Sequence, residues 1–416
     1  MPPRVSHCLL LAPLVWAACA VGQTTVTMRG VEAPPAGRVK AVGLEGVVFT
    51  SESGVPGVKG AKPAEIATVV SWDRVAGVEG DLASDAAPFM DAAQKLWRAR
   101  TRLDRGDIVG AEPLFEEIFP TYAGKQGPTG VVACGGLLRC RLGLGAQTAA
   151  VAPWLAYLNA VGDTGTLALP SADPDPTAPA AVESASGLAP ALPPIWVNLP
   201  AVQSLARSDW KLAGLSGRAA VLGAYYEQAA RFEAGLPAAA PGADVEHDDA
   251  VALVREVVVS RIGDDARRAA ARQALTARLK KHPPAWKEAW IHAAVGRSML
   301  LESDPETQLL GVAELAELPS HLERVNPYLT GIALAEAAVA TAKLGDVAGA
   351  ARLRNELADR FPGHPALEWE PLRAIPAAAP GAGGPSSNSV PPNAAPAANP
   401  APSDGSTPDP NHGGST

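Results

Sequence analysis

Few residues in this sequence have the types and spacing that chemistry requires. The adjacent residues His247, Asp248 and Asp249 offer the nitrogen and oxygen ligands that a metal ion takes. They also fall where a helix is predicted to begin, and acidic side chains at that place are stabilised by the helix dipole without any metal. We therefore interpret them as the start of a helix with Asp249 as its cap, and the sequence predicts no metal site. Helix caps are likewise predicted at Asp264, Asp304 and Asp346.

Three other patterns come close to known motifs but miss the spacing that each motif needs. Residues 54–63, GVPGVKGAKP, lack the G-x-x-x-x-G-K spacing of a phosphate-binding loop. In residues 214–217, GLSG, the second glycine comes one position too early for a nucleophile elbow. His292 follows Glu288 and Trp290 in a predicted helix, and we interpret it as a satisfied histidine in a helix interface. The sequence predicts no catalytic residue and no cofactor, and it favours a function other than catalysis.

The cysteines do not predict a disulfide or a metal site. Cys8 and Cys19 lie in the N-terminal apolar segment, whereas Cys134 and Cys140 lie in a stretch predicted to be helical. Six positions along a helix separate two side chains by about 120° around the axis and roughly 9 Å along it. This separation is too large for a disulfide. We expect two buried thiols that pack as small hydrophobic side chains.

Residues 1–22 have the features of a secretory signal peptide. Arg4 supplies the positive charge, residues 9–21 form a short apolar run, and small residues at 18–20 suit a cleavage site. The apolar run is shorter than the roughly 20 residues that cross a bilayer, so no membrane span is expected after signal removal. The sequence therefore predicts export, to the periplasm or to the cell exterior.

A lipoprotein is the alternative interpretation of this N-terminus. In that case Cys19 would carry the lipid after signal cleavage. Trp16 stands where such a motif prefers an aliphatic residue, and we therefore favour a signal peptide without lipid attachment.

Composition limits the classes of partner. The chain of 416 residues has a formal net charge of −8 and contains no basic cluster, which argues against binding to nucleic acid or to anionic membrane surfaces. Hydrophobic residues make up 47% and charged residues 19%, which is typical of a globular protein. The preference for alanine, and for arginine over lysine, indicates a GC-rich bacterial genome.

The periodicity of the sequence divides the chain into six predicted segments. These are a signal peptide at 1–22, a small β-rich domain at 23–82, a helical block at 83–162, a Pro/Ala-rich loop or linker at 163–199, a helical array at 200–374 and a tail at 375–416. The β-rich domain contains β-branched residues interrupted by glycines, and we expect four to six short strands with Trp72 in their core. The tail has no aromatic residue and almost no charge, so it is predicted to be disordered.

Residues 163–199 interrupt the helical pattern and have two dissimilar halves. The first half is acidic and rich in proline, and it is predicted to be a mobile loop or linker. The second half contains LAPALPPIW at residues 188–196. We expect this apolar end to pack into a groove of its own protein rather than to serve as a ligand for another protein.

Two predicted helical hairpins, near residues 84–118 and 331–361, share one pattern of small residues. In each, a glycine follows an alanine by seven positions, and a second alanine follows the glycine by five. These residues are Ala99, Gly106 and Ala111 in the first hairpin, and Ala338, Gly345 and Ala350 in the second. The pattern resembles a tetratricopeptide repeat (TPR), in which small residues at these places let neighbouring helices pack closely.

The resemblance covers about two repeats and has departures. Arg354 stands where the family prefers an aromatic residue, Pro120 comes early, and Pro113 lies inside a predicted helix, where it should cost stability or kink the chain. The resemblance implies a TPR-like array of α–α hairpins (an α-solenoid). Together with the segments above, the predicted fold is mainly α, with an N-terminal small β-domain, this array and a disordered C-terminal tail.

Arrays of this kind present concave surfaces that commonly bind proteins or peptides. The first hypothesis is therefore an exported scaffold for protein–protein interaction in the bacterial cell envelope, with a protein or peptide as its partner. The alternatives are a small-ligand binder with an aromatic groove and an envelope hydrolase with a site between the β-domain and the array. Trp196, Trp286 and Trp290 form the candidate interaction surface. If LAPALPPIW docks in the aromatic groove, the protein fills this groove with its own chain (self-plugging). An open groove would instead favour the binding of a small ligand.

Overall fold

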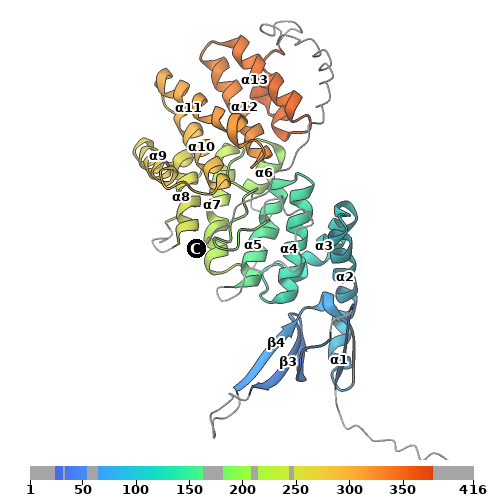
Figure 1. The fold of residues 1–416 in the computed structure, drawn as a ribbon. Helices are drawn as coiled ribbons and strands as arrows, with labels where there is room; N and C mark the ends of the chain where they lie inside the picture. The colour runs from blue at the N-terminus through green and yellow to red at the C-terminus, as the bar shows by residue number, and fades with distance from the viewer. Residues whose placement is uncertain are drawn as a thin grey trace, which may run out of the picture. The chain divides into compact units, whose positions relative to one another are not determined.

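The structure is a computed structural model that describes residues 24–30, 33–53, 64–162, 181–207, 214–242 and 248–377. All of these fall within one compact unit, Met1–Ala377. The chain is mainly helical and carries a small N-terminal β region of two sheets (Figure 1). This confirms the predicted fold class, mainly α with an N-terminal β region. The predicted signal peptide, the acidic half of the insertion, His247 and the tail after residue 377 lie outside the described residues.

The β region contains a two-stranded and a three-stranded antiparallel sheet. Its strands are β1 (Thr25–Met28), β2 (Arg38–Gly43), β3 (Gly46–Ser53), β4 (Ala64–Val70) and β5 (Val75–Glu79), with orders β1-β5 and β2-β3-β4. The β2–β3 hairpin turns at Gly43 and Gly46, which pair with each other. Gly46 has φ +142°, and a Cβ there would lie 2.0 Å from the carbonyl oxygen of Val70. Only glycine fits this turn, and the prediction of four to six strands is confirmed.

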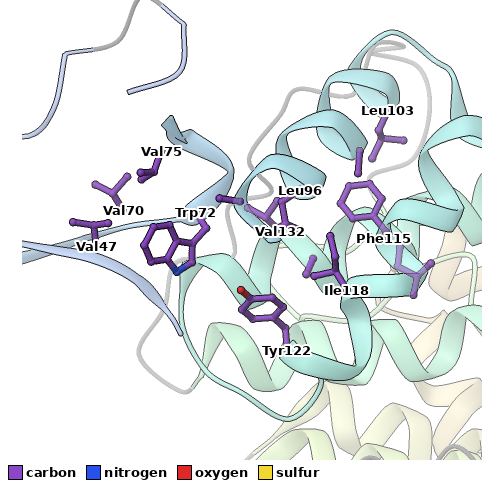
Figure 2. Close-up of a cluster of buried hydrophobic side chains, with 14 of the residues drawn as sticks. Val47, Val70, Trp72, Val75, Leu96, Leu103, Phe115, Ile118, Tyr122 and Val132 are labelled. Atoms are coloured by element: carbon purple, nitrogen blue, oxygen red, sulfur yellow. The ribbon is translucent and has the colours of Figure 1, made fainter. Parts of the chain in front are cut away.

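Trp72 is the core anchor of the β region, as predicted, and its side chain is fully buried. It lies in a 3-10 turn, η1 (Trp72–Arg74), where its ring stacks on Phe89 with centroids 5.2 Å apart. The indole Nε1 donates a hydrogen bond to the carbonyl oxygen of Gly43 at 2.8 Å. Figure 2 shows Trp72 beside valines of the strands and close to the first helices. The β region and these helices therefore share one apolar core.

The first helical block consists of two hairpins after a short entry helix. The helices are α1 (Ala83–Ala86), α2 (Met90–Asp104), α3 (Ile108–Tyr122), α4 (Pro128–Gly143) and α5 (Gln147–Val161), with the 3-10 turn η2 (Ala87–Phe89) between α1 and α2. Asp107 caps α3 by accepting a hydrogen bond from the Gly110 N–H at 3.0 Å, and Gly106 supplies the positive φ of the turn. Helix α3 continues through Pro113 and Pro120.

The second helical block follows residues 181–199. Its helices are α6 (Pro200–Ala206), α7 (Gly217–Glu233), α8 (Asp249–Ile262), α9 (Asp265–Leu279), α10 (Ala285–Met299), α11 (Pro305–Glu317), α12 (Pro327–Lys343), α13 (Val347–Arg360) and α14 (Glu370–Arg373), with a π-helical turn at Leu318–Leu322 and a 3-10 turn at Pro365–Glu368. The predicted caps Asp264, Asp304 and Asp346 are confirmed. The cap of α8 is Asp248 and not Asp249, because the side chain of Asp248 accepts from two N–H groups of the first turn.

Consecutive hairpins stack on one another. Helix pairs such as α4–α5, α10–α11 and α12–α13 form hairpins, and the second helix of one hairpin contacts the first helix of the next, as α3 contacts α4 and α11 contacts α12. The closest approach within α10–α11 is at Gly296 and Gly311, where a Cβ on either glycine would lie within 3 Å of the other's carbonyl oxygen. A TPR-like array would have this arrangement, and the resemblance to that family stays a prediction.

No helix in the described part of the chain is long and apolar enough to cross a membrane.

Candidate functional site

The candidate site is the groove of the helical array that residues 181–199 occupy, which we call the groove segment. This segment contains no helix and no strand. Its apolar side chains are nonetheless almost fully buried, namely those of Leu188, Ala189, Leu192, Ile195, Trp196 and Val197. The prediction that LAPALPPIW packs into a groove of its own protein is confirmed.

Two helices of the second block hold the middle of the groove segment by the carbonyl oxygen of Pro190. The indole Nε1 of Trp290, on α10, donates to this oxygen at 2.9 Å. The side-chain Nδ2 of Asn326, the N-cap of α12, donates to the same oxygen at 3.1 Å. The other amide atom of Asn326, Oδ1, accepts from the Leu329 N–H at 2.9 Å. One asparagine therefore starts α12 and binds the segment at the same time.

Donors from two more helices, α5 and α7, and a second donor on α10 reach other carbonyl oxygens of the segment. Trp154 on α5 donates to Gly187 at 3.0 Å. Tyr226 on α7 donates through its hydroxyl to Leu192, and Arg297 on α10 donates through Nη2 to Trp196 at 2.6 Å. A fourth donor, Arg218 on α7, reaches the carbonyl oxygen of Ser186.

The composition of the segment suits burial of an extended chain. Proline has no N–H group, so Pro190, Pro193 and Pro194 leave no main-chain donor to satisfy. A buried carbonyl oxygen without a donor is costly, and the side chains of the helices supply these donors. The helices therefore bind the main chain of the segment as well as its side chains.

A buried charge network lies beside the end of the segment. Arg297 is 3% exposed and donates to both carboxylate oxygens of Glu336, on α12, at 2.7 Å. Its Nη2 also donates to Glu233, on α7, at 3.1 Å. Arg261, on α8, donates to Glu233 at 2.9 Å and lies 3.6 Å from Glu336. Two arginines and two glutamates thus balance in charge across four helices.

Burial and pairing act in opposite directions on this network. Burial alone would raise the pKa of Glu336, but the guanidinium groups of Arg297 and Arg261 hold it below its ordinary value. Burial likewise opposes the charge of Arg297, and Glu336 and Glu233 outweigh that effect and raise its pKa. Arg297 and Glu336 therefore stay charged at neutral pH.

The structure corrects the candidate interaction surface. Trp196 and Trp290 are 1% and 0% exposed, so neither forms part of an open surface. Trp196 meets Tyr226 edge to face at 5.7 Å. Trp286 is half-buried, packs edge to face on Trp290 at 5.1 Å, and lies under the Lys287 ammonium group. Trp196 belongs to the groove segment itself, and Trp290 is buried beside the segment, where it donates to the carbonyl oxygen of Pro190.

A second hollow, which the sequence did not predict, lies in the β region. We call it the β-region pocket; it has a volume of about 530 Å³. It is lined by Thr24, Thr25, Val26, Pro34, Pro35, Gly37, Arg38, Val39, Lys40, Phe49, Asp81 and Leu82. A pocket on the face of a sheet is lined by alternate residues of each strand. The consecutive residues 24–26 and 38–40 therefore place this pocket along the edges of β1 and β2.

The other residues singled out from the sequence have structural surroundings. Cys134 and Cys140 are free and buried, and burial raises the pKa of each thiol to about 12, as expected of thiols that pack as hydrophobic side chains. His292 lies at a helix interface, where its Nδ1 lies 2.9 Å from Glu314 on α11. No group of three or more metal-ligating side chains that could hold an ion occurs among the described residues.

Sequence reasoning missed the charge network, although a signal was present. Arg297 follows the apolar run AAVG on α10, and Glu336 interrupts the apolar run GIALAEAAVA on α12. A single charge within an apolar helix indicates either a buried ion pair or a functional group. The pairing of the two residues could not be predicted, because 38 residues separate them in the sequence.

Comparison with known proteins finds no match among protein-family models, curated proteins or solved structures.

Proposed function

We propose that this protein is a non-catalytic scaffold for protein–protein interaction that is exported to the bacterial cell envelope. One observation carries the proposal: a stack of helix hairpins holds a proline-rich chain segment without helix or strand through side-chain donors to its carbonyl oxygens. Stacked helical hairpins commonly present surfaces of this kind to proteins and peptides. The signal-peptide features of residues 1–22 support the location.

Exposed apolar side chains support the same function. Leu309 and Leu310 are adjacent on α11 and are 58% and 56% exposed, and Leu301, just before that helix, is 37% exposed. Exposed apolar clusters rimmed by polar residues mark interaction sites more often than isolated leucines do. The scaffold therefore has surface left for contacts even with its groove filled.

Affinity capture from the native envelope fraction, with the full chain as bait, tests the proposal. Deletion of the β region is unsuitable as a control, because it would uncover the core that contains Trp72 and Phe89. Two matched baits carry exposed substitutions instead, Leu309→Glu with Leu310→Glu on α11, and Arg38→Glu on β2. We expect a partner whose purified form binds the bait saturably and loses affinity for one of the two variants. The absence of any saturable protein partner contradicts the proposal.

A specific observation favours a second candidate function, small-ligand binding in the β-region pocket. Its volume of about 530 Å³ falls within the range of small-molecule sites, and it combines apolar side chains with the cationic Arg38 and the hydroxyls of Thr24 and Thr25. A thermal-shift screen of small anions would detect this function. Stabilisation that disappears in Arg38→Glu supports it, and no stabilisation by any compound leaves the scaffold as the sole proposal.

A further inference from the structure

We propose that the groove formed by α5, α7, α10 and the N-terminus of α12 is a peptide-recognition site. Its ligand is an extended, apolar segment with the pattern Pro-Pro-x-aromatic, and residues 186–197 are a built-in occupant that a partner's segment of the same chemistry can replace. This inference rests on the proposed scaffold function and names the site and the partner class.

The groove binds a main chain, and this is the first support. Donors on α5, α7 and α10, together with the N-cap of α12, reach the carbonyl oxygens of the occupant. Contacts to carbonyl oxygens are independent of the side chains of the bound segment. Any extended chain that presents carbonyl oxygens at these places can take the same donors, and prolines in it avoid unsatisfied N–H groups.

The occupant has no regular structure of its own, and this is the second support. Residues 186–197 form neither a helix nor a strand, so no ladder of main-chain hydrogen bonds ties them to the fold. Their order depends on the groove walls, as the order of a bound peptide depends on its receptor. The segment can therefore leave without breaking a helix or a sheet.

The groove wall is charged, and this is the third support. Arg297 and Glu336 are 3% and 4% exposed with the segment in place, and the Nη2 of Arg297 donates to the carbonyl oxygen of Trp196 in the segment. Desolvation of charges opposes docking, and water solvates the same groups again when the segment leaves. A groove lined only by apolar side chains would gain no such solvation energy when the segment leaves. This balance is suited to exchange of one segment for another.

Specificity in this site comes from the aromatic anchor. The ring of Trp196 is 1% exposed, lies edge to face with Tyr226 at 5.7 Å, and follows Pro193, Pro194 and Ile195 in sequence. Its carbonyl oxygen binds the fully buried guanidinium of Arg297. Buried aromatic anchors and arginines dominate the affinity of many interfaces.

The test uses a fluorescent synthetic peptide of residues 183–199 and the full chain. In the chain, Trp196→Ala weakens the built-in occupant and leaves the groove wall intact. We expect this variant to bind the peptide at least tenfold more tightly than the unsubstituted chain does. A peptide with the same Trp→Ala change should bind at least tenfold more weakly. Adding Trp290→Phe to the chain, which removes one donor to Pro190, should also weaken binding.

Circular dichroism and thermal melting verify that each variant is folded. If Trp196→Ala does not fold, the unsubstituted chain decides: excess peptide with a photoreactive group at the Leu192 position should cross-link to α7 or α10. A folded Trp196→Ala chain that does not bind the peptide overturns the inference, and so does the lack of cross-linking in the second experiment. If the affinity capture described above identifies a partner that binds at α11 or β2, the scaffold function is supported even when this inference about the groove fails.

Discussion

The junction between the β region and α2 and the groove that residues 181–199 occupy both bury large aromatic side chains, but they treat charge differently. At the junction, Trp72 stacks on Phe89, and an ion pair beside them joins the buried carboxylate of Asp73, 1% exposed, to the Arg100 side chain, 29% exposed. In the groove, Arg297 and Glu336 are 3% and 4% exposed. The junction buries one member of an ion pair and leaves the other partly exposed, whereas the groove buries both members.

The difference bears on how each region should respond to change. An apolar core loses stability with lost volume and tolerates changes that conserve volume. A buried charge network stabilises the fold only when every charged group has its partner, because removal of one partner leaves a desolvated charge unpaired. The following predictions separate these two behaviours.

The largest effect is expected from breaking the charge network. Arg297→Met leaves Glu336 buried without its main partner, and the free energy of unfolding should fall by roughly 3–5 kcal/mol. Addition of Glu336→Leu should recover most of this loss, because the double variant replaces the pair with apolar side chains. Urea denaturation at pH 7 measures both. If the double variant is less stable than the single variant, the groove does not behave as a charge network.

A smaller effect is expected from overfilling the apolar core of the first block. A Cβ at Gly136 would lie 2.2 Å from the ring of Phe115, so Gly136→Ala should cost about 1–3 kcal/mol. Phe115→Leu in the same chain makes room and should restore part of the loss. Thermal melting of the two variants measures this. A double variant that loses the sum of both single effects would show that the contact is not the cause.

The caps should respond equally in both blocks, because a cap is a local interaction. Asp107 accepts from Gly110 at 3.0 Å in the first block, and Asp346 accepts from Gly349 at 2.7 Å in the last hairpin. Replacement of either aspartate by alanine should cost about 1 kcal/mol. Urea denaturation of the two single variants provides the measurement. A difference of several-fold between them would mean that the two hairpins are not equivalent.

The smallest effect is a pH dependence of the last hairpin. Burial lowers the pKa of His364 below its ordinary value of 6.5, although its hydrogen bond to the carbonyl oxygen of Tyr328 acts against this. The unfolded state then binds more protons than the folded state, so stability should fall as the pH drops from about 6.5 towards the lowered pKa.

The matched variant for that measurement is His364→Asn. The Oδ1 of asparagine can take the place of Nδ1 and accept from the Ala366 N–H, and asparagine does not titrate; it is too short to replace Nε2 as donor to Tyr328. Denaturation between pH 7 and pH 5 should show a shallower slope for the variant than for the unsubstituted chain. Equal slopes would assign the pH dependence to other groups.

Local chemistry in the sequence was enough to predict much of the fold. Period-2 and helical patterns, glycine turns and aspartate caps predicted the strands, the hairpins and the core position of Trp72, because each depends on neighbours within a few residues. The cap of α8 was misplaced by one residue, since Asp248 and Asp249 are both good caps and only the geometry decides between them.

The candidate site was predicted only in part. An apolar, proline-rich run predicts burial, so docking of LAPALPPIW could be inferred. Self-plugging was an open alternative to an exposed aromatic groove, and the burial of Trp196 and Trp290 decides for it. The contact between Pro190 and Asn326 spans 136 positions, and no local pattern predicts such a pairing.

Hydrogen exchange of the full chain, followed by mass spectrometry, tests the central claim most directly. If residues 186–197 are a bound occupant, their amides should exchange through a local opening of lower free energy than the opening of α10 and α12. The helices should stay protected while the segment exchanges. Exchange of the segment only together with these helices would contradict the account and make residues 186–197 an ordinary part of the core.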